Sequence, residues 1–119
     1  MVKKNTGLKR ILYAARYSYN GLKHSVLHES AFRQEFIAAI VLIPLACWLD
    51  VSKLERLLMI SAVFLVMIVE LLNTAIEAVV DRVSTEHHEL SGLAKDMGSA
   101  AVFISLVVLA GIWGTILFL

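Results

Sequence analysis

The sequence is short of charged residues. Only 18% of its 119 residues are Asp, Glu, Lys or Arg, whereas 59% are hydrophobic. Soluble domains carry about a quarter charged residues, and a chain this small has too little interior to hide so much apolar surface. The composition therefore excludes a soluble globular domain, and its apolar excess also excludes a disordered chain. It leaves one small integral membrane domain.

Cysteine and the common nucleotide-binding motifs are also scarce or absent. The single cysteine, Cys47, excludes a disulfide framework. Neither a P-loop nor the glycine-rich dinucleotide fingerprint occurs in the sequence. His87 and His88 are adjacent rather than one helical turn apart and have no cysteine nearby, which does not fit a zinc site. Any phosphate or metal chemistry must therefore come from another arrangement of side chains.

Acidic residues are missing from the first 28 positions, which carry six of the eleven Lys and Arg residues. Apolar residues recur at three- and four-residue spacing over 8–27, with basic residues between them. This pattern predicts an amphipathic helix, within an arm at 1–28, that lies on an anionic membrane surface. The alternative is an amphipathic helix packed against a protein core. Beside so much hydrophobic sequence, we expect no nucleic-acid partner.

Three stretches are predicted to cross a bilayer as helices; the apolar core of the first, 36–49, is short, so we expect its polar start to continue as helix into the interface. We expect span one at 31–49, span two with a cytoplasmic extension at 55–81, and span three at 97–119. The charged segment 82–96 is expected to be the loop that joins spans two and three. The predicted fold is therefore all-α and membrane-integral, with an N-terminal surface helix and three transmembrane helices in a single domain.

The basic residues also predict the orientation of the chain. Segments rich in Lys and Arg stay in the cytoplasm, so we expect the N-terminal arm on that side. Span one then leaves the cytoplasm and span two returns to it, which places the 82–96 loop in the cytoplasm although that loop is itself acidic. The C-terminus is then expected on the opposite side. Trp48 and Trp113 fall near the ends of their spans, where amphipathic rings prefer to sit.

Four polar residues, Glu70, Asn73, Glu77 and Asp81, interrupt the second half of span two. At about 100° per residue, they fall within an arc of about 80° on one face of a helix. Ionisable groups at membrane depth are costly and usually functional. A structural seam, in which polar side chains bond neighbouring helices, is the alternative. A seam suits Asn73 alone better than it suits a row of carboxylates, so we favour a functional site.

Carboxylates and an amide beside a cytoplasmic loop are hard oxygen donors of the kind that Mg²⁺ prefers. Glu29 begins span one at the expected height of Glu77, and cations stand nearby at Arg10 and Lys95. Carboxylates for a metal and cations for phosphate indicate phosphoryl transfer, which depends on positioning and charge neutralisation. Glu70 lies deepest, where it could take a proton from a lipid hydroxyl.

Segments 70–82 (ELLNTAIEAVVDR) and 89–101 (ELSGLAKDMGSAA) resemble the bacterial membrane-embedded diacylglycerol kinase family. Segments 29–35 (ESAFRQE) and 46–51 (ACWLDV) are similar to its Gram-negative branch, and the resemblance covers nearly the whole chain. It implies a homotrimer of three-span subunits in the bacterial inner membrane, with the N-terminus in the cytoplasm. It further implies transfer of the γ-phosphate of MgATP to diacylglycerol, giving phosphatidic acid.

The resemblance also implies roles for single residues. Glu70 matches the general base proposed for the family, Asn73 an active-site residue beside it, and Glu29 and Glu77 the pair that binds Mg²⁺. The residues that match ATP-binding positions are Arg10, Tyr17, Glu29, Glu77, Glu86, His87, His88, Lys95 and Asp96. The residues that match lipid-contacting positions are Arg10, Ala14, Tyr19, Lys23, Ala31, Glu35, Trp48, Glu70, Ser99 and Trp113.

Two other functions stay open at this point. An undecaprenol kinase would use the same scaffold, because Glu70 could serve either hydroxyl, although segments 32–34 and 48–50 favour diacylglycerol. A non-catalytic oligomeric membrane protein would use the polar residues of span two as a helix seam. A seam should tolerate Glu70→Gln, whereas a general base should not.

Overall fold

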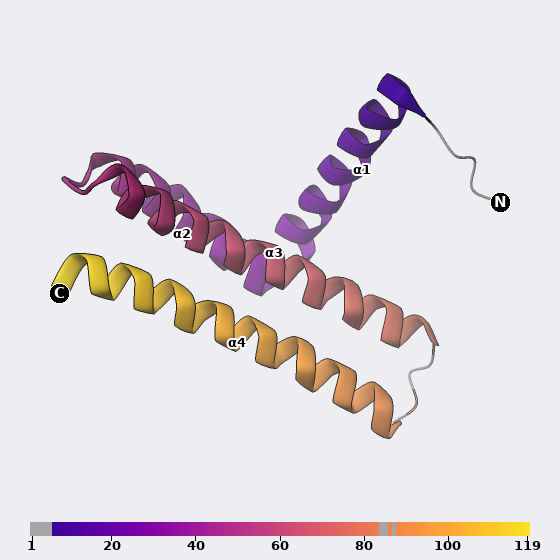
Figure 1. Cartoon of the computed structure of the whole chain (residues 1–119). Coiled ribbons are helices and arrows are strands. Elements are labelled where there is room, and N and C mark those ends of the chain that lie inside the picture. Colours follow the sequence, from indigo (N-terminus) through magenta and orange to yellow (C-terminus); the bar gives the residue numbers. More distant parts are fainter. Residues whose placement is uncertain (1–5, 84–85, 87) are drawn as a thin grey trace.

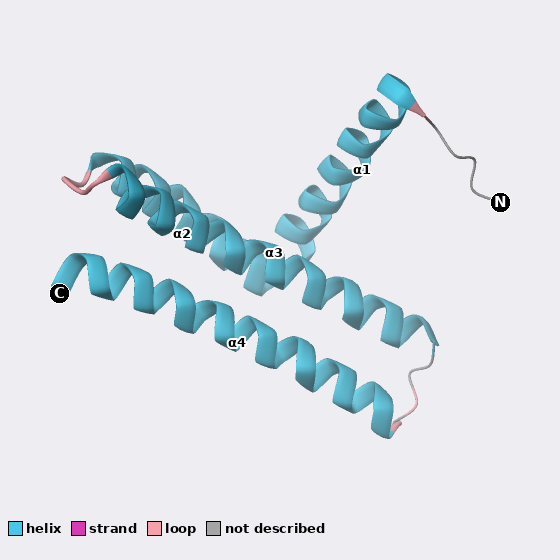
Figure 2. Cartoon of the chain, viewed as in Figure 1, coloured by secondary structure: helices cyan, strands magenta, loops and turns pink. Residues whose placement is uncertain are grey.

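The computed structural model describes residues 6–83, 86 and 88–119. Within them the chain forms four α-helices and no strand: α1 (Gly7–His28), α2 (Ser30–Trp48), α3 (Lys53–Val83) and α4 (Glu89–Phe118) (Figures 1 and 2). The helices α2, α3 and α4 are each long and apolar enough to cross a membrane. The prediction of an all-helical chain with three apolar spans is confirmed.

The longest helices, α3 and α4, lie antiparallel and side by side, and α2 packs against α3 (Figure 1). The helix α1 leaves the other three near the start of α2 and projects away from them (Figure 1). Its side chains are almost all accessible, and only Ser25 near its end is buried. The apolar residues of α1, such as Leu8 and Ile11, are therefore not covered by this chain's own core.

Arginines at two helix starts hold the ends of the preceding helices. Arg33 in the first turn of α2 donates to the carbonyl oxygens of Val26 (2.9 Å) and Leu27 (2.8 Å) at the end of α1. Arg56 in α3 donates in the same way to the carbonyl oxygens of Ala46 (3.0 Å) and Leu49 (2.9 Å) beside the end of α2. Since the last carbonyls of a helix have no partner within it, these guanidinium groups define both turns.

The start of α3 carries a capping box. The Ser52 hydroxyl accepts from the backbone N–H of Glu55 at 3.1 Å, and the Glu55 carboxylate accepts from the backbone N–H of Ser52 at 3.0 Å. This reciprocal pair satisfies two N–H groups that an open helix end leaves free. It explains why the turn between α2 and α3 can be as short as residues 49–52.

The loop expected at 82–96 is much shorter in the structure, and that prediction is wrong. The helix α3 continues to Val83, and α4 already begins at Glu89. The ring Nδ1 of His88 accepts from the backbone N–H of Leu90 at 3.1 Å and so caps α4. The charged residues of this segment misled the prediction, because a helix can extend beyond the membrane with polar side chains on its surface.

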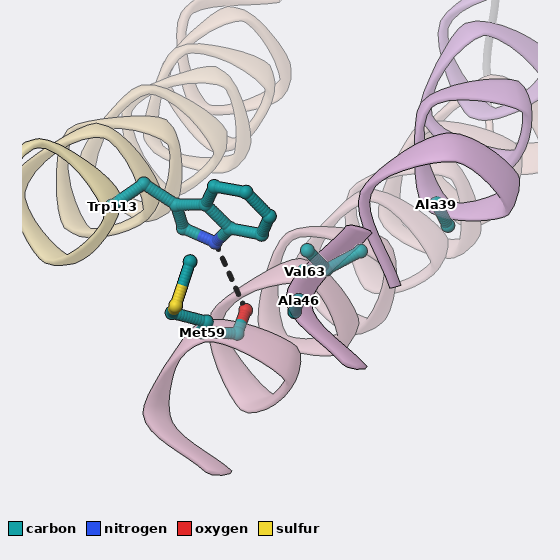
Figure 3. Packing of buried hydrophobic residues seen from close by; sticks show 5 residues of the cluster. All are labelled: Ala39, Ala46, Met59, Val63 and Trp113. Atoms are coloured by element: carbon teal, nitrogen blue, oxygen red, sulfur yellow. Dashed lines mark hydrogen bonds between the residues drawn. The ribbon is translucent and has the colours of Figure 1, made fainter. Parts of the chain in front are cut away.

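The apolar core lies toward the end of the bundle that holds the α2–α3 turn. Ala39, Ala46, Met59, Val63 and Trp113 are buried together there, and Figure 3 shows the Trp113 indole reaching across to α3. Its Nε1–H donates to the carbonyl oxygen of Met59 at 3.1 Å. This contact fixes the relative position of α3 and α4 along their axes.

Candidate active site

The polar residues of span two lie on the inner side of α3. Glu70 and Asn73 are buried, with 7% and 8% of their surfaces exposed. The Asn73 side-chain Nδ2 donates to the Glu77 Oε1 at 3.1 Å, one helical turn further on. The three side chains therefore form a continuous polar row that begins inside the bundle and ends at its surface.

This row leads, at Glu77, into a cavity of about 440 Å³ between the end of α1, the residue that joins α1 to α2, and the last turns of α3. Three carboxylates line it, those of Glu29, Glu77 and Asp81. Its remaining wall includes His24 and Ser25 from α1. Two segments that are distant in sequence, 21–29 and 71–81, are thus brought together around one acidic cavity.

Several carboxylates in this region are partly withdrawn from water and lie close to one another. Glu70 lies close enough to Glu77 and Glu29 for their charges to interact, and the charges of Glu35 and Glu70 also interact. Like charges at such separations raise the energy of the site unless a cation or a proton compensates them. A cation bound beside these carboxylates, or protonation of one of them, would relieve the repulsion.

A metal at this place would need ligands beyond the protein. Among the described residues, no group of three His, Cys, Asp or Glu side chains is close enough to hold a metal ion. Mg²⁺ commonly uses only one or two carboxylates and completes its shell with water and substrate phosphates. Two carboxylates lining one cavity fit that mode and do not fit a site closed by protein ligands alone.

An ion pair joins α3 to α4 at the edge of this cavity. Lys95 Nζ lies 2.8 Å from Asp81 Oδ1, and both side chains remain about half exposed. Exposed ion pairs contribute little to stability, so Lys95 can exchange this carboxylate for another anion at small cost. The neighbouring Asp96 is exposed and lies on the same helix, α4.

Glu35 lies deeper in the bundle, on α2. Its Oε2 is buried without a hydrogen-bond partner. Glu35 and Gln34 stand at a second cavity of about 240 Å³, whose other walls are the apolar side chains of Ala38, Leu42, Val63, Val66, Leu106 and Leu109. A polar end and apolar walls suit an amphiphilic molecule.

The other residues singled out from the sequence are spread over the surface. Those on α1 are all exposed, namely Arg10, Ala14, Tyr17, Tyr19 and Lys23. Ala31, at the start of α2, and Ser99, ten residues into α4, are also exposed. Glu86 and His88 lie in the short connection, whereas His87 lies outside the described residues.

The two tryptophans differ in their surroundings. Trp48 ends α2 and is 82% exposed, so it is open to contact lipid. Trp113 is only 9% exposed and its N–H is bonded inside the chain. Trp113 also packs beside Met59, about 16 Å along α3 from Glu70. This placement argues against a direct contact between Trp113 and a lipid substrate.

Comparison with known proteins identifies the family. A family profile described as "Prokaryotic diacylglycerol kinase" matches residues 16–117. The chain belongs to the prokaryotic diacylglycerol kinase family. The diacylglycerol kinase of Pseudomonas aeruginosa is 57% identical over 97% of this chain and 94% of its own length. Those of Escherichia coli K12 and Haemophilus influenzae are 56% and 54% identical, over 95% and 97% of this chain and 93% and 98% of their own lengths.

Several residues that line the two cavities of this diacylglycerol kinase family member were not predicted from the sequence. His24 and Ser25 face the acidic cavity, and Gln34 faces the deeper one. A usable signal existed only for α1, where Gly21 and Ser25 are four residues apart and share a face. It also missed the pairing of Lys95 with Asp81, because that contact depends on the register between two helices.

Proposed function

We propose that this chain is a membrane-embedded lipid kinase that transfers the γ-phosphate of MgATP to the hydroxyl of diacylglycerol, giving phosphatidic acid and ADP. The observation that carries the proposal is the row from Glu70 through Asn73 to Glu77, which leads from a buried position into the acidic cavity. Such a row can hold a lipid hydroxyl at its buried end and a nucleotide at its open end.

Glu70 is the general base in this proposal. Its carboxylate removes the proton of the lipid hydroxyl as that oxygen forms a bond to the γ-phosphorus. The bond between the γ-phosphorus and the oxygen that bridges it to ADP breaks, and ADP leaves with the bonding electrons. The burial of Glu70 excludes competing water from the base.

Glu29 and Glu77 would hold Mg²⁺ together with the nucleotide phosphates. When bound there, Mg²⁺ supplies positive charge that screens the phosphates from the carboxylates and from the incoming oxygen. The role of Asn73 is to hold the Glu77 carboxylate through the 3.1 Å hydrogen bond. Lys95 would leave Asp81 and donate to a phosphate, with Asp96 beside it on α4.

The remaining nucleotide contacts favour more than one copy of the chain. Arg10 stands eleven residues before Gly21, which lines the acidic cavity, and that separation is about 16 Å along α1. Since α1 projects away from its own bundle (Figure 1), the exposed Arg10 and Tyr17 are accessible to a neighbouring subunit. We therefore propose a homotrimer in which these two residues, with Glu86, His87 and His88, complete the ATP site between subunits.

The lipid is proposed to approach from the apolar side. The cavity beside Glu35 offers a polar end near Glu70 and apolar walls for the acyl chains. The surface helix, the start of α2 and α4 supply the outer contacts, at Arg10, Ala14, Tyr19, Lys23, Ala31 and Ser99, with Trp48 at the far end. Trp113 is left out of this set because of its burial.

The proposed location is the bacterial inner membrane, with the N-terminus in the cytoplasm. The basic, acid-free arm supports this orientation. It places α1 on the anionic cytoplasmic surface, where its exposed apolar side chains can enter the lipid boundary. The acidic cavity then opens on the side where ATP is present.

The central test measures transfer of radiolabelled γ-phosphate from MgATP, with diacylglycerol and undecaprenol offered separately in mixed micelles. We expect labelled phosphatidic acid, and Glu70→Gln should lower its rate by at least about 100-fold, because a general base contributes that much. Glu55→Gln is the matched control, since Glu55 lies at the opposite end of α3. Wild-type rates for Glu70→Gln would refute the general-base role, and labelling of undecaprenol alone would refute the proposed substrate.

The metal assignment has a separate test. Glu77→Gln keeps the size of the side chain but removes a charge from the cavity. The Mg²⁺ concentration that gives half-maximal rate should rise about 10-fold or more, as expected when one charged ligand is lost. An unchanged Mg²⁺ dependence with lowered activity would show that Glu77 acts in another way.

A further inference from the structure

Gly98 of α4 lies against the amide of Asn73 on α3. A Cβ atom built at Gly98 would overlap with Asn73 Oδ1 and would lie 3.2 Å from Asn73 Cγ. The chain's six glycines all lie within the described residues, and the other five have open space where a Cβ would stand. Gly98 is buried as well, so the close approach belongs to the interior of the bundle.

The Asn73 amide uses its two ends differently. Its Nδ2 donates to Glu77 Oε1, whereas its Oδ1 is buried against Gly98 without a hydrogen-bond partner. An amide can rotate so that its oxygen and nitrogen exchange places. A rotated amide would turn an acceptor toward the Glu77 carboxylate, which donates nothing when it is ionised. The hydrogen bond to the Glu77 carboxylate therefore depends on the observed orientation of the Asn73 amide.

From this contact we infer that Gly98 is a positioning residue for the active site. Its missing side chain leaves the space that Asn73 Oδ1 occupies, and the α4 backbone confines the amide so that Nδ2 faces Glu77. Any side chain at this position pushes the amide away and releases the Glu77 carboxylate. This role rests on the proposed function, since it acts through Asn73 and Glu77.

The variant Gly98→Ala should lower kcat/KM for MgATP by about 10- to 100-fold, the range expected when a catalytic group moves by about 1 Å. The Mg²⁺ concentration for half-maximal rate should rise with it, whereas KM for diacylglycerol should stay within about twofold. Gly111→Ala is the matched control, because Gly111 lies on the same helix with open space around its Cα. It should leave all three quantities unchanged.

A double-mutant cycle separates action through Asn73 from a general effect on packing. We expect Asn73→Ala and Gly98→Ala each to lower kcat/KM, and the double variant to be no worse than Asn73→Ala alone. Fully additive losses would overturn the positioning role, because Gly98 would then act independently of the amide. Should Gly98→Ala fail to fold, the double variant should fold again, since it removes the overlapping amide; continued misfolding would also overturn the proposal.

A spectroscopic readout reports on the amide without reference to activity. The chain has three asparagines, so selective ¹⁵N-Asn labelling in detergent micelles gives few side-chain amide signals, and Asn73→Ala identifies the one that belongs to Asn73. Gly98→Ala should shift this signal, and Gly111→Ala should not. An unshifted signal would overturn the inferred contact.

The outcomes also separate this inference from the proposed function. Wild-type activity of Asn73→Ala would remove Asn73 from the active site and would overturn the positioning role of Gly98 with it. Impaired Asn73→Ala together with wild-type Gly98→Ala would overturn the positioning role alone. In that second case, the assignments of Glu70 and Glu77 would stand.

Discussion

The sharpest structural prediction concerns Trp113, which sequence reasoning placed against lipid and the structure places in the core. The change is Trp113→Phe, which keeps an aromatic ring but removes the indole N–H and part of its volume. The lost hydrogen bond to the Met59 carbonyl is worth about 0.6 kcal/mol, the average for bonds between helices in a membrane bundle. That carbonyl keeps its helical partner within α3, so it is not left unsatisfied.

The smaller ring adds a packing loss. A buried Trp→Ala change costs about 3–5 kcal/mol, and Phe restores most of the removed volume, which leaves a loss of about 1–1.5 kcal/mol. The expected total is a loss of about 2 kcal/mol in the free energy of unfolding, or roughly a 30-fold change in the folding equilibrium. Trp48→Phe should change this free energy by less than about 0.5 kcal/mol, because Trp48 is 82% exposed.

The assay is reversible unfolding of the protein in mixed micelles by increasing amounts of SDS, followed by far-ultraviolet circular dichroism. The Michaelis constant for diacylglycerol is measured on the same preparations. For Trp113→Phe we expect lowered stability and an unchanged Michaelis constant. Unchanged stability with a raised Michaelis constant would refute the reasoning and return Trp113 to the lipid-contacting set.

Two further changes test the helix junctions. Arg33→Gln removes both hydrogen bonds to the end of α1. The local stability should fall by about 1 kcal/mol, so that backbone hydrogen exchange around 26–29 becomes about fivefold faster. Equal protection in Arg33→Gln and in the control Arg16→Gln would contradict this. Ser52→Ala removes half of the capping box and should lower the free energy of unfolding, measured by SDS titration, by about 1 kcal/mol. If Ser52→Ala is as stable as the control Ser61→Ala, the capping role of Ser52 is contradicted.

The positions of the helices could be predicted because their cause is local. Apolar runs of sufficient length must form helices in a bilayer, and the three long apolar helices agree with that rule. The prediction of a loop over 82–96 was wrong because charged residues mark where a segment leaves the membrane and not where a helix ends. Leu90, Leu93 and Ala94 recur at helical spacing, and that signal was outweighed by Lys95 and Asp96.

The placement of Trp113 could not be predicted from hydropathy. Within a membrane, the neighbouring helix and the lipid are both apolar, so a hydrophobic side chain can face either at similar cost. The deciding contact pairs Trp113 with the carbonyl oxygen of Met59, 54 residues earlier in the chain. Such a pair depends on how α3 and α4 are aligned, which one-dimensional periodicity does not contain.

The candidate site was predictable to the extent that it follows one helix. The spacing of Glu70, Asn73 and Glu77 places them on one face, and the Asn73–Glu77 hydrogen bond is a direct consequence of that spacing. Contacts between different helices could not be predicted from spacing along one helix. The partner of Lys95 and the close approach of Gly98 to Asn73 both arise from the packing of α4 on α3.

In the proposed mechanism, the length of α3 is what lets so small a chain bring two unlike substrates together. From Glu70 to Asp81 the helix advances about 16 Å, enough to pass from the apolar cavity beside Glu35 to the acidic cavity beside α1. A soluble kinase must build separate walls for its lipid and for its nucleotide. In the proposed arrangement, the bilayer confines the lipid to one end of the row and the aqueous phase delivers ATP to the other, so that one helix face is enough to join them.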